Sequence, residues 1–149
     1  MALYYLDTSA LVKLYVREPG SDLLIRLADR TNRHRFAVLA LARAELHAAL
    51  RRRQRDGDLD AVLAEDLLNR FNQHLESRFE RQLVSDSLID LAANLVDRHP
   101  LRAYDAVQLA GCLMLRANSA NYEPNFVCSD RKLLQAAKLE GVACLDPTD

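Results

Sequence analysis

Four acidic residues in this sequence stand where solvation alone does not explain them. Each is set against or among apolar residues, in the segments YYLD, ALARAELHAAL, RAYDAVQLA and FVCSD: Asp7, Glu45, Asp105 and Asp130. Most of the other acidic residues sit where solvent is expected, for example around Gly57 or, for Glu76 and Glu80, near arginines. We therefore take these carboxylates as the candidate catalytic and metal-binding residues.

Carboxylates gathered in one place repel one another and need a counter-charge. Two unit charges about 4 Å apart cost on the order of 4 kcal/mol at an effective dielectric constant near 20. Since the candidate ligands are hard oxygens and no Cys or His completes a zinc motif, Mg²⁺ or Mn²⁺ is favoured over Zn²⁺. Such an ion neutralises phosphate charge and activates a coordinated water, so we predict hydrolysis of phosphodiester bonds.

A structural alternative exists for each of these residues. Aspartate is a common N-cap, so each of the aspartates could do no more than cap a helix, and Glu45 could be a surface residue. Neighbouring hydroxyl residues could cap instead without burying a charge: Thr8, Ser9 and Ser129. These hydroxyls are also candidate supporting groups beside the acids.

The elements that must position the acids follow from the apolar pattern. Short apolar runs predict strands at residues 2–6, 36–40, 126–128 and 142–145, and the run 79–84 could form another. Apolar residues at helical spacing predict helices after Asp7, over 23–28, from 44 to near Gly57, and over 63–75, 88–96, 103–117 and 133–139. Strand and helix thus alternate almost throughout.

This alternation predicts an α/β fold with a mostly parallel sheet of four or five strands and helices on both faces. Ligands in such folds bind outside the carboxyl ends of the strands. Asp7 and Asp130 each fall where a strand gives way to a helix, at that edge. Glu45 lies early in the helix after the second strand and Asp105 opens an enclosed helix, so all four carboxylates are expected to share one pocket.

Composition sets wider limits. The 149 residues favour one domain over residues 1–149, and 20 basic against 21 acidic residues neither indicate nor exclude a nucleic-acid partner. The basic runs 30–35 and 51–55 are candidate phosphate contacts, or simply solvated faces. No apolar run is long enough to span a bilayer, and the cysteines lack metal spacing and are typical of a reduced, cytoplasmic protein: Cys112, Cys128 and Cys144.

The segments LDTSALVKLYVREPGS, ARAELHAAL, AYDAVQLAG and NFVCSDRKLLQAAKLEGV resemble, in this order, the signature segments of PIN-domain proteins, especially VapC-type toxins. The resemblance implies an α/β/α sandwich that binds Mg²⁺ or Mn²⁺ and cleaves RNA to leave a 5′-phosphate. It also implies a cytoplasmic homodimer that a cognate antitoxin inhibits. By position, the candidate acids match the family's set, with Asp7 and Asp105 as first choices for direct metal contact and Thr8 and Ser9 as supporting groups.

Other functions remain open at this point. A catalytically silent interaction module could keep the same fold, and PIN domains also occur in RNA-processing nucleases that are not toxins. A haloacid-dehalogenase-like phosphatase would need a second aspartate at position 9, which is Ser9. A phosphoryl-accepting receiver domain would need its acceptor much farther from the N-terminus than Asp7.

Overall fold

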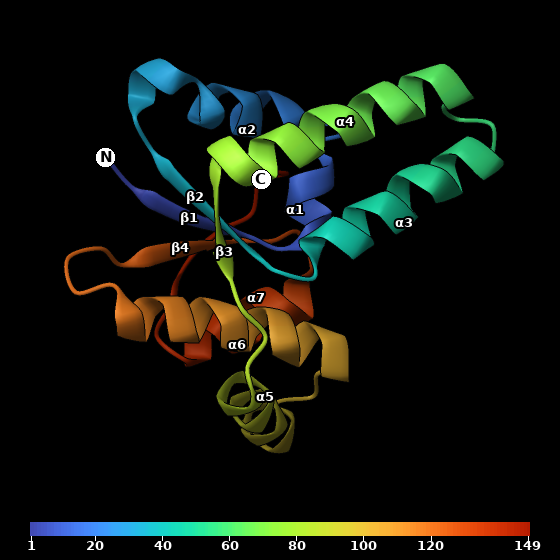
Figure 1. Cartoon of the computed structure of the whole chain (residues 1–149). Helices are drawn as coiled ribbons and strands as arrows, with labels where there is room; N and C mark the ends of the chain where they lie inside the picture. Colours follow the sequence, from blue (N-terminus) through green and yellow to red (C-terminus); the bar gives the residue numbers. More distant parts are fainter.

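The computed structural model describes residues 1–149 as a three-layer α/β/α sandwich around a parallel sheet (Figure 1). The strand order is β3-β2-β1-β4-β5, and every pairing is parallel. The strands are β1 (Leu3–Leu6), β2 (Arg35–Leu39), β3 (Phe79–Gln82), β4 (Pro124–Val127) and β5 (Ala143–Leu145). The predicted fold class is confirmed, and the run near residue 80 does form a strand.

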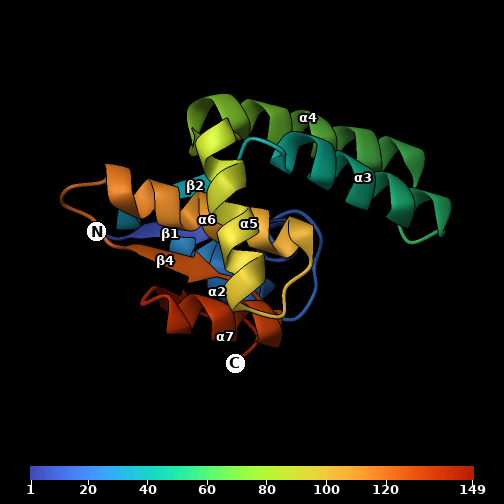
Figure 2. The same cartoon turned by 90° about the horizontal axis from the view of Figure 1, so that it is seen from below.

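Helices cover both faces of the sheet. One layer holds α1 (Thr8–Val12), α2 (Ser21–Ala28), α3 (Ala42–Arg55) and α4 (Ala61–Ser77), with the short 3-10 turn η1 (Arg30–Asn32). The other layer holds α5 (Asp86–Arg98), α6 (Ala103–Asn118) and α7 (Arg131–Leu139). Helices α3 and α4 form an antiparallel hairpin that extends beyond the sheet in two perpendicular views (Figures 1 and 2).

Two apolar cores lie on opposite faces of the sheet. Leu3, Tyr5 and Phe126 face the core under α5, α6 and α7, whereas Leu6 and Val127 face the core under α1 to α4. Both faces of the central strands are therefore buried, which is why these strands read as continuous apolar runs. Helix α6 is enclosed between the sheet and α5, as its nearly uniform apolar sequence predicts.

The segment ALVKLYV, expected to be helical, is helical only through Val12. Beyond it the chain continues in turns. The buried Lys13 ammonium pairs with Glu18 at 2.9 Å, and the Tyr15 hydroxyl hydrogen-bonds to His74 Nδ1 of α4 at 2.7 Å. The local Lys13–Glu18 pair and the tertiary contact between Tyr15 and α4 together override the helical spacing.

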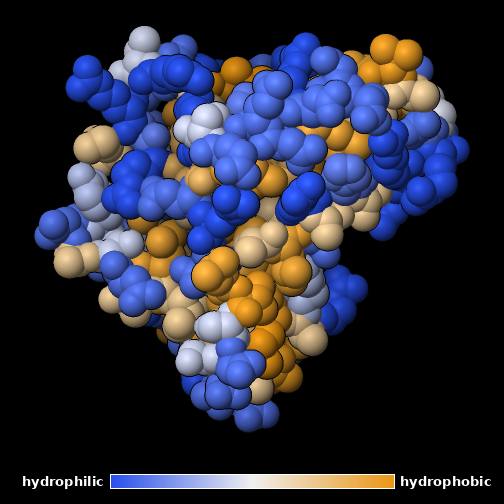
Figure 3. Space-filling model, in the orientation of Figure 1, coloured by the Kyte–Doolittle hydropathy of each residue, from blue (hydrophilic) through white to orange (hydrophobic).

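Exposed apolar side chains gather at one place on the surface. Leu83, Ile89 and Val96, just before and along α5, are 69%, 46% and 41% exposed. Figure 3 shows apolar surface over this lower part of the molecule, whereas the surface over α3 and α4 is mostly hydrophilic, with a smaller apolar area near the tip of that hairpin. None of the helices combines the length and apolarity that crossing a bilayer requires.

An ionic cluster ties the end of α5 to the end of α7. Arg98 Nε and Nη2 donate to the Glu140 carboxylate at 3.2 and 3.0 Å, and His99 Nε2 lies 2.6 Å from Glu140 Oε2. The Arg98 guanidinium and then the His99 ring lower the pKa of Glu140. The link therefore depends on the ionised carboxylate.

A lowered pKa in the folded state makes this link sensitive to acid. The contribution of this link to the free energy of unfolding is present above the ordinary glutamate pKa of 4.5 and is lost as the pH falls through the lower folded-state pKa. We expect wild type to be more stable than Glu140→Gln at neutral pH, with the gap closing below that value. Urea unfolding from neutral to acidic pH measures the gap, with the exposed Glu123→Gln as control. A gap independent of pH would contradict the assignment.

Candidate active site

The four candidate acids approach the edge where the parallel strands end. Asp7 directly follows β1, and Asp130 stands three residues past the end of the adjacent strand β4. Glu45 lies in the first turn of α3, which follows β2, and Asp105 lies in the first turn of α6. The fold therefore brings residues more than a hundred positions apart to one edge.

Asp7 is the most buried of these acids, at 6% exposure. Its Oδ1 accepts hydrogen bonds from the Ala10 backbone N–H at 2.9 Å and from the Ser9 hydroxyl at 2.7 Å, so Asp7 itself caps α1. Burial raises the pKa of Asp7, hydrogen bonds from Ser9 and other donors oppose that rise, and the charge of Asp105 adds to it. Asp7 is thus a buried carboxylate with another carboxylate as neighbour.

Asp130 has a capping role as well. It is exposed, and its Oδ1 accepts from the Leu133 backbone N–H at 3.1 Å at the start of α7. Cys128 connects it to Asp7, because the Cys128 Sγ accepts from the Asp130 N–H at 3.2 Å and its thiol pKa is raised by burial and then by Asp7. The capping alternative is therefore confirmed for Asp7 and Asp130, which cap α1 and α7 with one oxygen each in place of the neighbouring hydroxyls.

Asp105 and Glu45 complete the set without capping. No side chain caps α6, and the Asp105 carboxylate has only a loose contact with the highly exposed Arg102, at 3.6 Å. Glu45 is half-buried. Burial raises the pKa of Tyr104, and the charges of Glu45 and Asp7 raise it further. The Tyr104 hydroxyl therefore lies close to carboxylates from α3 and β1.

The donor set fits a hard divalent cation in an open site. None of the ion pairs involves Asp7, Glu45 or Asp130, so these carboxylates lack a basic counter-charge. The Ser129 hydroxyl oxygen is buried and makes no hydrogen bond of good geometry, although Asp146 lies nearby. Mg²⁺ commonly takes one or two carboxylates and keeps several waters. Asp7 and Asp105 meet that requirement.

The expectation that all four carboxylates share one pocket is not met in this conformation. No group of three or more His, Cys, Asp or Glu side chains stands close enough to hold an ion together. Asp7 and Asp130 each commit one oxygen to a helix cap, and like charges favour separation. The structure juxtaposes Asp7 with Asp105, and leaves Glu45 and Asp130 farther out.

Three residues near the site escaped sequence reasoning. Asp146 directly follows β5, and the same strand-then-aspartate pattern that selected Asp7 would have found it in ACLD. Tyr104 and Gln108 lie on α6 among apolar residues. Gln108 is only 2% exposed, and a polar residue within an otherwise apolar helix was the available signal.

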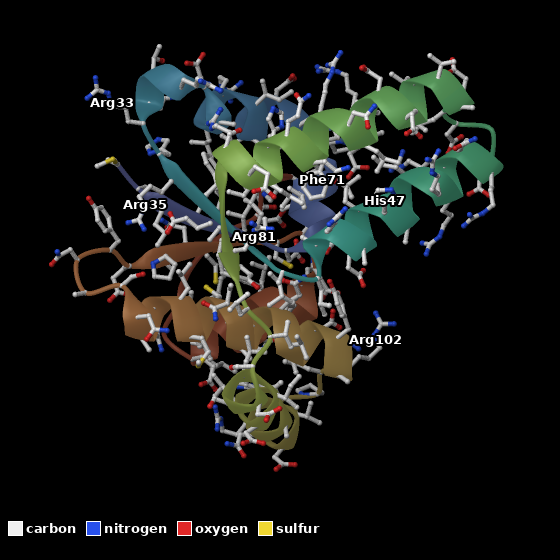
Figure 4. All side chains as sticks on the ribbon, in the orientation of Figure 1. Arg33, Arg35, His47, Phe71, Arg81 and Arg102 are labelled. Atoms are coloured by element: carbon white, nitrogen blue, oxygen red, sulfur yellow. The ribbon has the colours of Figure 1, made fainter.

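The basic runs do not gather around the acids. Arg35 begins β2, at the amino edge of the sheet, so the run 30–35 lies opposite the site (Figure 4). Within the run 51–55, Arg51 pairs with Glu65 and Arg53 with Glu18. The run 30–35 therefore does not supply phosphate contacts near the acidic site. Figure 4 instead shows Arg102 and His47 on the side of α3 and α6 where the site lies.

A separate hollow lies away from the acids. It has a volume of about 330 Å³ and is lined mainly by apolar residues of α2, α4 and neighbouring segments, including Ile25, Phe36 and Phe79. Apolar hollows are the usual first guess for a binding site. In this protein the carboxylates are the groups that could bind a metal ion, and they lie at the strand ends. We therefore place the candidate active site there and not in the apolar hollow.

Comparison with known proteins identifies the family. The family model described as PIN domain matches residues 4–139. The chain therefore belongs to the PIN-domain family. Ribonuclease VapC46 from Mycobacterium tuberculosis is 36% identical to it over 152 residues, spanning 99% of this chain and 100% of that protein. PIN-domain ribonucleases generally depend on a divalent metal.

Solved structures share the fold at lower sequence identity. VapBC2 from Rickettsia felis, bound to a promoter DNA fragment, aligns with a TM-score of 0.64 at 15% identity, over 96% of this chain and 97% of that one. PAE2754 from Pyrobaculum aerophilum aligns with a TM-score of 0.63 at 24% identity, over 96% and 83% of the two chains. FitAcB from Neisseria gonorrhoeae aligns with a TM-score of 0.59 at 15% identity, over 99% of this chain and 98% of that one.

Proposed function

We propose that this protein is an endoribonuclease that uses Mg²⁺ or Mn²⁺ to hydrolyse RNA phosphodiester bonds, with residues 1–149 forming one PIN domain. The observation that carries the proposal is Asp7, a 6% exposed carboxylate without a basic partner, whose neighbour is a second carboxylate, Asp105. Burying such a charge is costly unless it is paired or coordinates a metal. The 36% sequence identity to Ribonuclease VapC46 supports RNA as the substrate.

Each acid has a role in this proposal. Asp7 and Asp105 would hold the ion directly, while Glu45 and Asp130 would bind its waters or complete its shell. A bound divalent ion supplies charge neutralisation at the phosphate and a more acidic coordinated water. Ser9 keeps the Asp7 carboxylate oriented through its hydrogen bond at 2.7 Å. Arg102, highly exposed and beside Asp105, can contact a substrate phosphate.

The biological setting belongs to the same proposal. The resemblance to VapC-type toxins and the relative VapC46 support a cytoplasmic toxin that a cognate antitoxin inhibits. A homodimer is supported by the exposed apolar side chains near α5, because soluble monomers rarely expose contiguous apolar patches. Growth arrest on expression, relieved by a co-expressed small partner protein, would distinguish a toxin from an RNA-processing nuclease.

Metal removal tests the enzymatic proposal. We expect purified protein to cleave a mixed RNA pool with Mg²⁺ or Mn²⁺ and to lose that activity in EDTA, because the ion supplies the acidified water and the charge that neutralises the phosphate. Readdition of Mn²⁺ should restore cleavage. Asp105→Asn should remain inactive at every metal concentration, whereas Asp97→Asn, the same change at an exposed position of α5, should cleave like wild type.

The products separate the proposal from its alternatives. A 5′-phosphate on the downstream fragment is the expected product. Cleavage that persists in EDTA, or in Asp105→Asn, would overturn the assigned site. Absence of cleavage in all samples, with a folded protein, would favour the catalytically silent interaction module.

A further inference from the structure

A largely buried hydrogen-bond network involves the sequence neighbours of Asp7 and Asp105. At its centre is Gln108 of α6, which is 2% exposed. The Tyr5 hydroxyl of β1 donates to Gln108 Oε1 at 3.1 Å. Gln108 Nε2 donates to the Tyr104 hydroxyl at 2.8 Å and, at a longer 3.4 Å, to the Thr8 hydroxyl. A single side chain thus links β1, α1 and α6.

The network is joined to the acids through the backbone. Thr8 follows Asp7 directly, Tyr104 precedes Asp105 directly, and Gln108 lies one helical turn after Asp105. The Thr8 and Tyr104 hydroxyls are themselves 3.1 Å apart. Hydrogen bonds between residues 96 and 100 positions apart in the sequence therefore join the segments that carry Asp7 and Asp105.

Counting donors and acceptors shows that the network has one hydroxyl proton left over. The Gln108 amide supplies one proton to each of the Thr8 and Tyr104 hydroxyls, which together carry two protons of their own. One of those protons forms the bond between the hydroxyls, and no protein acceptor takes the other. Either hydroxyl can donate in the bond between them, so the remaining proton belongs to Thr8 or to Tyr104, which directly neighbour Asp7 and Asp105 in the sequence.

Stability alone does not require such an arrangement. A leucine or methionine at position 108 would match the apolar residues that surround it on α6, and buried polar networks are favourable only when fully satisfied. Contacts outside the ligand shell that fix the position of the ligands are, in contrast, a general feature of metal sites.

We propose that Gln108 is a positioning residue of the active site: through its hydrogen bonds to Thr8 and Tyr104 it sets the separation of the neighbouring Asp7 and Asp105. This proposal rests on the proposed function, because its consequence is the affinity for a divalent ion. Gln108 touches neither metal nor substrate, and acts through the residues that do.

Metal affinity provides a test that does not depend on turnover. We expect Gln108→Met, which keeps the length of the side chain but removes the amide, to weaken Mn²⁺ binding by about tenfold in calorimetric titration, the lower end for outer-shell partners. Tyr104→Phe should weaken it less. The double variant should be no weaker than Gln108→Met alone, because both changes break one network.

A matched control separates positioning from general destabilisation. Leu113→Ala opens the apolar core on the same helix without touching the network, and should lower the melting temperature while leaving the Mn²⁺ dissociation constant within about twofold of wild type. Equal weakening in Leu113→Ala at a similar loss of melting temperature would overturn the proposal. Wild-type affinity in Gln108→Met would also overturn it.

The outcomes distinguish this proposal from the proposed function. If Gln108→Met does not fold, Tyr104→Phe carries the test, and unchanged affinity in it overturns the role of the network. If wild type binds Mn²⁺ and cleaves RNA while the network variants match it, only the positioning role fails. If wild type neither binds Mn²⁺ nor cleaves RNA, the proposed function fails and the positioning role fails with it.

Discussion

Asp7→Asn is expected to lower metal-dependent RNA cleavage by at least about 100-fold, since loss of even an outer-shell partner of a metal site can cost that much. The helix cap should survive, because asparagine is as good an N-cap as aspartate and its amide oxygen can still accept from the Ala10 N–H. Only the charge is removed. Cleavage of the mixed RNA pool under saturating Mn²⁺ measures the effect.

The same substitution should have the opposite effect on stability without metal. Burial raises the pKa of Asp7, so its contribution to stability is present below the ordinary value of 3.8 and is lost as the pH rises through the folded-state pKa. In EDTA at neutral pH, Asp7→Asn should therefore melt at a higher temperature than wild type. The difference should shrink as the pH falls toward that value.

Metal should reverse this order. A ligand at 100 times its dissociation constant stabilises the folded state by about 2.7 kcal/mol. The asparagine variant should bind Mn²⁺ weakly and therefore gain little of this stabilisation. Asp97→Asn provides the matched control, because it makes the same change on the exposed face of α5. A variant that retains cleavage, or that is less stable than wild type in EDTA, would show that Asp7 serves only as a helix cap.

Gly111→Ala is expected to destabilise the fold by about 3 kcal/mol, even though alanine is favoured over glycine by about 1 kcal/mol in a helix. A methyl group there would overlap the Tyr5 hydroxyl and stand 3.0 Å from Leu39 Cδ1. Both neighbours are fully buried. Overpacking costs about 1–3 kcal/mol, and displacing Tyr5 leaves the Gln108 oxygen without its donor, at about 1–3 kcal/mol more.

Urea unfolding measures this change, and a double variant identifies its cause. Tyr5→Phe removes the hydroxyl that the methyl group would overlap, so Gly111→Ala should cost less in that background than in wild type. Tyr5→Phe alone supplies the reference for the lost hydrogen bond. If Gly111→Ala is as stable as wild type, α6 does not approach β1 as closely as the structure indicates.

The fold was predictable because its determinants are local. Apolar runs of strand length, apolar residues at helical spacing and capping residues between them follow directly from the order of residues, and they predicted the parallel sheet and every helix of eight or more residues. The end of α1 was not predictable, because the contact of Tyr15 with His74, 59 residues away in the sequence, contributes to it.

The candidate acids were also visible in the sequence, since a carboxylate among apolar residues, after a strand for Asp7 and Asp130 or early in a helix for Glu45 and Asp105, is a local feature. Their mutual arrangement was not. Only the tertiary structure placed Asp7 beside Asp105, left Asp130 exposed as a cap, and joined Tyr5, Thr8 and Gln108 in one network. The physical reason is that residue type and spacing specify elements, whereas distances between side chains depend on how those elements pack.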